Sequence, residues 1–226
     1  MKIGILQAGH TPDEMAGIGD YAALFRRLLA DQGFEFTTYS VVDGEFPENT
    51  HVQDGWLITG SRHGAYDDLA FIAPLETFIR EAFEAHSPLV GICFGHQIIA
   101  QALGGRVEKF SGGWSVGAQR YEMLGTEITQ NAWHQDQVVT LPEGAEVIAK
   151  SDFCAHAALL YKDRAFTVQW HPEFQADFID GLIRTRGRGV VPDELLEAAA
   201  ANLDAPVDND TLARQIGRFF HERRIA

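Results

Sequence analysis

The sequence predicts an α/β fold in which helices cover both faces of an open, mostly parallel sheet. Over the first half of the chain, short apolar segments alternate with segments of helical periodicity, in the order strand, helix, strand, strand, helix, strand, helix. This alternation is typical of parallel strands connected by helices. Glycine-containing loops follow the expected strands at 56–59 and 88–92. Sheets of this class gather their functional groups at the carboxyl ends of strands.

Each element of this sheet has its own signal in the sequence. Strands are expected at 2–6, 36–42, 56–59 and 88–92, where apolar residues are bounded by turn residues. Helices are expected at 21–29, at 75–83 and between Cys93 and Gly104, because apolar side chains recur there at helical spacing. Asp20 is suited to cap the first helix, Gly33 to end it and Pro74 to begin the second. The resulting order of elements is flavodoxin-like or Rossmann-like.

The second half of the chain changes character twice. Residues 105–170 alternate apolar and polar side chains, which predicts shorter and partly antiparallel strands. From Phe174 the chain is expected to be helical, with apolar stripes at 178–183, 195–203 and 212–220. Pro192 and Pro206 separate these stripes. We therefore predict one domain over residues 1–180 and a helical C-terminal extension over residues 181–226 that packs on it.

Composition restricts the kinds of partner. The net charge of −14 argues against nucleic acid or an anionic membrane as the main partner. The two cysteines, Cys93 and Cys154, cannot form a disulfide framework. The chain contains no apolar run long enough to span a membrane, and its first residues do not resemble a signal peptide. We expect a cytoplasmic protein.

The reactive centre is predicted in the segment Val90-Gly91-Ile92-Cys93-Phe94-Gly95-His96-Gln97. Here an apolar strand ends on Cys93 and turns at once into a helix, which is the pattern of a nucleophile elbow with sulfur in place of oxygen. Gly91 and Gly95 lack the side chains that would collide with neighbouring backbone in such a turn. The helix dipole favours a thiolate at this position. Cys93 is therefore the candidate nucleophile.

A cysteine nucleophile requires a base, and His171 is the best candidate. It lies in the segment Gln169-Trp170-His171-Pro172-Glu173. Pro172 disfavours helical geometry at His171, and in an extended segment residues two apart project to the same side. The Glu173 carboxylate can therefore accept a hydrogen bond from one ring nitrogen while the other takes the proton of Cys93. Together these residues form a candidate Cys-His-Glu triad.

The chain resembles the class I, or triad-type, glutamine amidotransferase domain. The resemblance rests on the elbow and on His171-Pro172-Glu173, and it extends over residues 1–180. Further matching segments are 56–61 with 66–68, 102–105, and 141–144 before 149–151. The pattern is most similar to the stand-alone branch that resembles the amidotransferase domain of GMP synthase. This resemblance implies hydrolysis of a γ-glutamyl amide through a thioester on Cys93, with ammonia or an amine as the first product.

The same resemblance assigns further site residues. The backbone N–H groups of Phe94 and Gly60 are the expected donors to the oxyanion of the tetrahedral intermediate. Gln97 matches the family position that helps to hold the substrate glutamine. Ser111, Trp114 and Ser115 lie in the segment that resembles the one receiving the α-amino and α-carboxyl groups of glutamine.

Other conspicuous residues have simpler explanations. Cys154 is expected to be a small buried residue. His134 and Asp136 lie in a segment that this branch places near the active site, but a structural role explains them as well. A solvated helix end explains Arg184, Arg186 and Arg188 better than an anion-binding patch. No metal-ligand spacing, P-loop or dinucleotide fingerprint is present, so neither a metal nor a cofactor is expected.

Three functions remain open at this point. The first is a glutaminase subunit that supplies ammonia to a separate synthase subunit, because no segment of the chain resembles a synthase domain. The second is a self-contained γ-glutamyl peptidase or hydrolase. The third is a non-catalytic binding or regulatory protein with the same fold, which the intact Cys93, His171 and Glu173 disfavour. In the first two cases the substrate is glutamine or another γ-glutamyl compound.

The roles assigned to His171 and Glu173 predict an order of activity losses. We expect Glu173→Ala to lose less γ-glutamyl hydrolysis than His171→Ala, because an orienting group is less essential than the base. Steady-state kcat/KM of the two purified variants measures this order. Equal or reversed losses would contradict the two roles.

Overall fold

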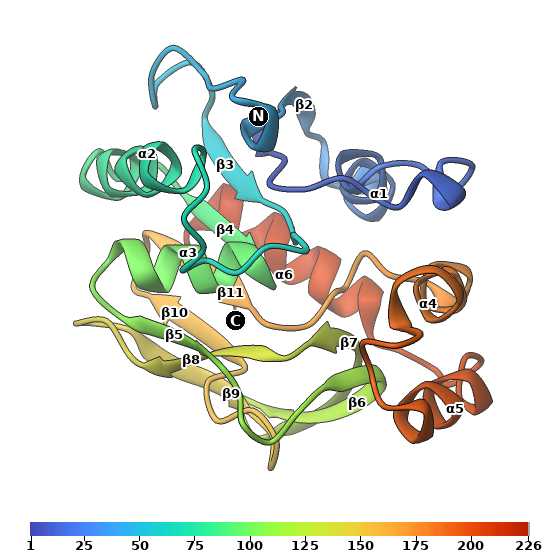
Figure 1. Ribbon diagram of the computed structural model, residues 1–226. Helices are drawn as coiled ribbons and strands as arrows, with labels where there is room; N and C mark the ends of the chain where they lie inside the picture. Colours follow the sequence, from blue (N-terminus) through green and yellow to red (C-terminus); the bar gives the residue numbers. More distant parts are fainter. Residues whose placement is uncertain (226) are drawn as a thin grey trace.

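A nine-stranded mixed sheet forms the centre of the protein. The computed structural model describes residues 1–225. The strand order is β2-β1-β3-β4-β11-β10-β9-β6-β7, and β5 and β8 form a separate two-stranded ribbon (Figure 1). The strands are β1 Lys2–Leu6, β2 Glu35–Tyr39, β3 Gly55–Ile58, β4 Leu89–Ile92, β5 Arg106–Lys109, β6 Ser115–Met123, β7 Thr126–His134, β8 Asp136–Thr140, β9 Glu146–Lys150, β10 Ala158–Tyr161 and β11 Ala165–Val168.

The sheet divides into a parallel and an antiparallel part. Strands β2, β1, β3, β4 and β11 are mutually parallel, and β10, β9, β6 and β7 continue the sheet in antiparallel pairing. The α/β class and the antiparallel strands expected in the second half are therefore confirmed. The strand β11 comes late in the sequence but pairs with β4, so that Val168 lies opposite Ile92. This register brings the chain that follows β11 to the same sheet edge as Cys93.

Helices cover both faces of the sheet, as the sequence predicts. Figure 1 shows α3 in front of the sheet and α6 behind it. Side chains of α2 and α3 share one buried apolar cluster with one face, and those of α1 and α6 share another with the opposite face. The helices are α1 Tyr21–Leu28, α2 Ile72–Glu84, α3 Phe94–Ala102, α4 Ala176–Leu182, α5 Asp193–Ala201 and α6 Asn209–Glu222, with a π-helical turn at Ile183–Gly187 and short 3-10 turns at Asp13–Met15, Ala30–Gln32 and Val41–Asp43.

Local signals explain where several elements begin and end. Asp20 caps α1 as predicted, since its carboxylate accepts the Ala23 N–H at 2.8 Å. Pro74 lies in the first turn of α2, which begins two residues earlier, at Ile72. The strand expected at 36–42 ends at Tyr39, because the chain turns into a 3-10 segment that closes at Gly44 with a φ of 85°.

The C-terminal extension contributes to two different parts of the core. Helix α6 buries Phe219 and Phe220 in the cluster that covers the sheet on the α1 side. Helices α4 and α5 instead form a third apolar cluster with Tyr21 of α1 and Val116 of β6. The boundary at residue 180 stays a prediction.

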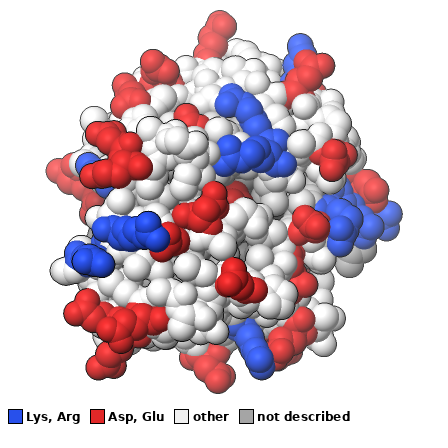
Figure 2. Space-filling view, turned by 90° about the vertical axis from the view of Figure 1, so that its right-hand side faces the viewer, with Lys and Arg blue, Asp and Glu red and all other residues white. Residues whose placement is uncertain are grey.

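Two surface properties follow from this arrangement. Within residues 1–225, no helix has the length and apolar character needed to cross a bilayer. Figure 2 views the molecule from the side at the right of Figure 1, where α1 and α4 lie. On this face the basic side chains form small separate groups between acidic ones. It offers no continuous basic surface of the kind that follows a phosphate backbone.

The burial of α6 predicts that it is essential to the main core. Phe219 is fully buried, and we expect Phe219→Ala to lower the free energy of unfolding by about 3–5 kcal/mol. Leu195 of α5 is 36% exposed and is the control, for which Leu195→Ala should change stability by less than about 0.5 kcal/mol. Urea denaturation followed by tryptophan fluorescence measures both. Similar losses for the two variants would show that α6 is not integrated into the core.

Candidate active site

The turn at Cys93 has the strained geometry that the flanking glycines predict. Cys93 adopts φ 52° and ψ −101° between β4 and α3. A Cβ at Gly91 would lie 2.5 Å from the Gly95 carbonyl oxygen, and a Cβ at Gly95 would overlap the Ile58 carbonyl. Non-glycine residues at positive φ persist where the surrounding structure enforces them, often at functional sites. The thiol is thus fixed at the N-terminus of α3, where the helix dipole favours its anion.

The segment after β11 holds His171 in a defined orientation. Its Nδ1 donates to Glu173 Oε1 at 2.7 Å, and both side chains are almost fully buried. The His171 backbone N–H donates to the Asn131 carbonyl at 2.8 Å. The imidazole stacks on Phe174 with ring centroids 3.9 Å apart and an interplanar angle of 4°. Because Nδ1 is engaged, Nε2 is the nitrogen left for chemistry.

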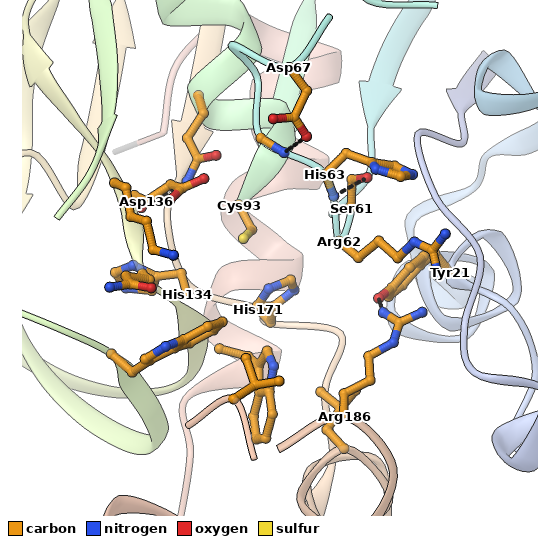
Figure 3. A pocket seen from close by; sticks show the side chains of 18 of the residues that line it. Tyr21, Ser61, Arg62, His63, Asp67, Cys93, His134, Asp136, His171 and Arg186 are labelled. Carbon is orange, nitrogen blue, oxygen red and sulfur yellow. Dashed lines mark hydrogen bonds between the residues drawn. The ribbon is translucent and has the colours of Figure 1, made fainter. Parts of the chain in front are cut away.

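Cys93 and His171 line one cavity of about 570 Å³. Figure 3 shows the Cys93 sulfur and the His171 ring near its centre. The sequence-predicted pair is therefore brought to the same space, and Glu173 lies behind His171. Other walls come from Tyr21, from the loop after β3, from residues 133–136 and from the C-terminal extension.

Gly60 is packed against the candidate base. A Cβ at Gly60 would lie 2.8 Å from Cε1 of His171, so a side chain there would displace the imidazole. The prediction assigned this glycine to a close approach of substrate, whereas the described contact is with the histidine ring. The Phe94 N–H is the first of α3 and has no carbonyl partner within the helix. The oxyanion role of both N–H groups stays a prediction.

The predicted substrate contacts occupy different positions relative to the cavity. Gln97 lines it, and its Nε2 donates to the Asp136 carbonyl at 2.9 Å. Trp114 also lines it. Ser111 is exposed and Ser115 is buried, and neither is among the residues that line the cavity. Substrate contacts of all four residues stay predictions.

Family comparison agrees with this geometry. The model of the family described as glutamine amidotransferase class-I matches residues 20–180. The chain belongs to this family. Gamma-glutamyl peptidase 4 of Arabidopsis thaliana is 32% identical over 205 residues, which cover 82% of this chain and 81% of that protein. The A chain of the glutamine-hydrolyzing GMP synthase of Archaeoglobus fulgidus, one of its subunits, is 35% identical over 165 residues, covering 69% of this chain and 84% of that one.

Solved structures share the fold of this glutamine amidotransferase. A glutamine amidotransferase from Methylobacillus flagellatus matches with a TM-score of 0.77 at 22% identity, covering 99% of this chain and 94% of that chain. A second, from Thermotoga maritima, has a TM-score of 0.73 at 21% identity and covers 98% and 97% of the two chains.

Sequence interpretation missed Gln169, which links the elbow to the base segment. Its Nε2 donates to the Cys93 sulfur at 3.6 Å, and its Oε1 accepts from Gln97 Nε2 at 3.2 Å. The signal was available, because Gln169, His171 and Glu173 alternate along one extended segment and project to the same side. Gln169 is fully buried and so positions both side chains rather than meeting solvent.

The arginines of the extension are a second correction. Arg184 is solvated, with a side chain that is 71% exposed and paired with Asp180. Arg186 and Arg188 instead line the cavity, and Arg186 is half-buried. The expected solvated helix end is wrong for Arg186, because the turn after α4 folds back over the cavity and packs Gly187 against Trp133 and Leu196.

The remaining conspicuous residues are buried. Burial raises the pKa of Cys154 to about 12, so its thiol stays protonated at neutral pH. His134 lines the cavity, and burial together with the nearby His171 lowers its pKa to about 3. His134 is therefore neutral at neutral pH. Within residues 1–225, no group of three His, Cys, Asp or Glu side chains is placed to bind a metal.

Electrostatics favour a protonated His171 beside an anionic Cys93. Burial lowers the pKa of His171, but the negative charges of Glu173 and Cys93 and the hydrogen bond to Glu173 outweigh this effect and raise the pKa to about 10. An imidazolium at this position stabilises a neighbouring thiolate. The site of this glutamine amidotransferase can therefore hold a charged nucleophile and a loaded acid at neutral pH.

This balance predicts the titration of His171 in variants. In the wild type, the ring should remain protonated as the pH rises past 6.5 and lose its proton near about 10. Glu173→Gln removes the larger favourable charge and should move the midpoint to lower pH. The Cε1–H chemical shift in a pH series of NMR spectra measures both midpoints. Cys93→Ala should also lower the midpoint, and an unchanged midpoint in Glu173→Gln would contradict this account.

Proposed function

We propose that this protein hydrolyses γ-glutamyl amides through a thioester on Cys93. The observation that carries the proposal is the shared cavity of Cys93 and His171, with the His171 ring hydrogen-bonded to Glu173. A nucleophile, a base and a group that orients the base are the elements of covalent acyl transfer. The printed names of the relatives, a peptidase of γ-glutamyl compounds and a subunit of GMP synthase, support this reaction class.

The first half of the reaction uses the charged Cys93–His171 pair. The thiolate attacks the γ-carbonyl carbon, and the carbonyl electron pair moves to oxygen. We assign the N–H groups of Phe94 and Gly60 as donors to this oxyanion. As the oxyanion collapses, the carbon–nitrogen bond breaks and His171 gives its Nε2 proton to the departing nitrogen. A free amine and a γ-glutamyl thioester on Cys93 result.

The second half regenerates the enzyme with water. His171, now neutral, takes a proton from water as the oxygen attacks the thioester carbonyl. Collapse of the second oxyanion breaks the carbon–sulfur bond and releases glutamate. The thiolate and the imidazolium are restored, so that protons balance over the cycle. Glu173 stabilises the imidazolium in both halves.

The structure of the cavity favours a self-contained hydrolase. Leu182, Thr185 and Arg186 of the C-terminal extension wall the cavity beside Cys93, so this chain itself supplies the side facing the departing amine. The peptidase relative has a similar length, since the alignment covers about four-fifths of each chain. A glutaminase subunit that serves a separate synthase is the second candidate, which the relative from Archaeoglobus fulgidus favours.

A covalent intermediate tests the proposed reaction. After incubation with glutamine or a γ-glutamyl dipeptide and acid quenching, we expect intact-mass spectra to show one γ-glutamyl group on Cys93. Cys93→Ala should form no adduct and lose turnover. Cys154→Ala is the matched control, because it removes the other thiol, which burial keeps protonated, and should retain both adduct and turnover.

Three outcomes separate the candidates. Turnover of the purified chain alone supports the self-contained hydrolase. Turnover that requires an added synthase subunit supports the second candidate. Normal turnover by Cys93→Ala would overturn the proposed reaction.

A further inference from the structure

One end of the cavity carries positive charge without a matching carboxylate. Arg62, in the loop after β3, and Arg186, in the turn after α4, both line it. Arg186 donates to two uncharged acceptors, the Tyr21 hydroxyl at 3.3 Å and the His10 carbonyl at 2.6 Å. Within residues 1–225, neither guanidinium forms an ion pair with a carboxylate. This is unexpected in a chain with 32 acidic and 18 basic residues.

The two guanidinium groups act on the same space. Figure 3 shows both side chains reaching toward Tyr21 at one side of the cavity. Partial burial lowers the pKa of His63, and the charges of Arg62 and Arg186 lower it further against the opposing effect of Asp67. The positive charges of both arginines therefore converge at this end. Like charges that converge in a partly enclosed space are stabilised by a bound anion.

Carboxylates occupy the opposite end. Figure 3 shows Asp136 and Arg186 on opposite sides of Cys93 and His171. The Asp136 carbonyl also holds Gln97, the predicted contact of the glutamyl group. The α-ammonium of a glutamyl group suits the acidic end. With its γ-carbonyl at Cys93, the departing amine then extends toward the two arginines.

We infer that Arg62 and Arg186 select γ-glutamyl substrates whose departing amine carries a carboxylate, as in a γ-glutamyl amino acid or peptide. This inference rests on the proposed γ-glutamyl hydrolysis and assigns a specificity to that site. A planar guanidinium binds a carboxylate through two parallel charge-assisted hydrogen bonds. Ammonia, the amine that leaves from glutamine, cannot reach this end. Arg186 is already oriented by Tyr21 and His10, which reduces the entropy lost on binding.

A matched substrate pair isolates the charge. γ-Glutamylalanine and γ-glutamylalaninamide differ in the terminal carboxylate and carboxamide and are otherwise alike. We expect the wild type to favour the carboxylate in kcat/KM by about tenfold or more, because a charge-assisted hydrogen bond is roughly twice as strong as a neutral one. Calorimetric binding of both compounds to Cys93→Ala, which cannot form the thioester, should show a preference in the same direction.

Variants of the arginines test the assignment. Arg186→Gln and Arg62→Gln should each reduce the preference severalfold, and Arg186→Lys should retain part of it because the charge remains. Arg62→Gln gives an independent reading if loss of the Tyr21 and His10 contacts destabilises the Arg186 variant. Arg184→Gln is the matched control, since Arg184 is on the same turn but points to solvent and pairs with Asp180. It should leave the preference unchanged.

The outcomes separate this inference from the proposed reaction. Equal binding of the two compounds to Cys93→Ala would overturn the inference, whether or not the wild type turns them over. A preference that survives in both glutamine variants would also overturn it. Absence of any γ-glutamyl turnover, with the binding preference present and reduced in the glutamine variants, would support the carboxylate site and reject the proposed reaction.

Discussion

The parallel pairing of β11 with β4 is the contact on which the site depends. It sets Val168 opposite Ile92, so the chain leaves both strands at the same edge, one into the elbow at Cys93 and the other toward His171. The Cys93 N–H donates to the Val168 carbonyl at 2.8 Å, which continues the ladder as far as the nucleophile. A slip of one residue in this register would turn the side chains of the base segment to the other face of the sheet. The candidate chemistry thus depends on backbone hydrogen bonds of the core.

The site also concentrates features that cost stability. Cys93 is held at a positive φ, and the polar side chains of Gln169, His171 and Glu173 are nearly or fully buried. Desolvation of charged groups is costly unless they are paired and hydrogen-bonded. The bond between His171 and Glu173 offsets part of this cost, while Glu173 Oε2 has no hydrogen-bond partner within residues 1–225. The surrounding apolar clusters must stabilise this arrangement.

Much of this architecture could be predicted because its causes are local. The two glycines around Cys93 indicated a tight turn, and the spacing of His171 and Glu173 indicated that their side chains could meet. The pairing of β11 with β4 could not be predicted, since no local property of residues 165–168 selects a neighbour in the sheet. The place of Arg186 was missed for a similar reason. Its position over the cavity results from the fold of a distant segment and from contacts with Tyr21 and His10.

The packing around the His171 ring restricts how its proton can travel. Phe174 covers one face of the imidazole, Gly60 closes the Cε1 edge, and Glu173 holds Nδ1. The ring cannot flip or swing out without breaking these contacts. The proton taken from one reaction partner must therefore be returned through the same nitrogen, Nε2, and each partner must come to the ring in turn. The histidine is a fixed relay point, and the order of events at the site is set by what moves past it.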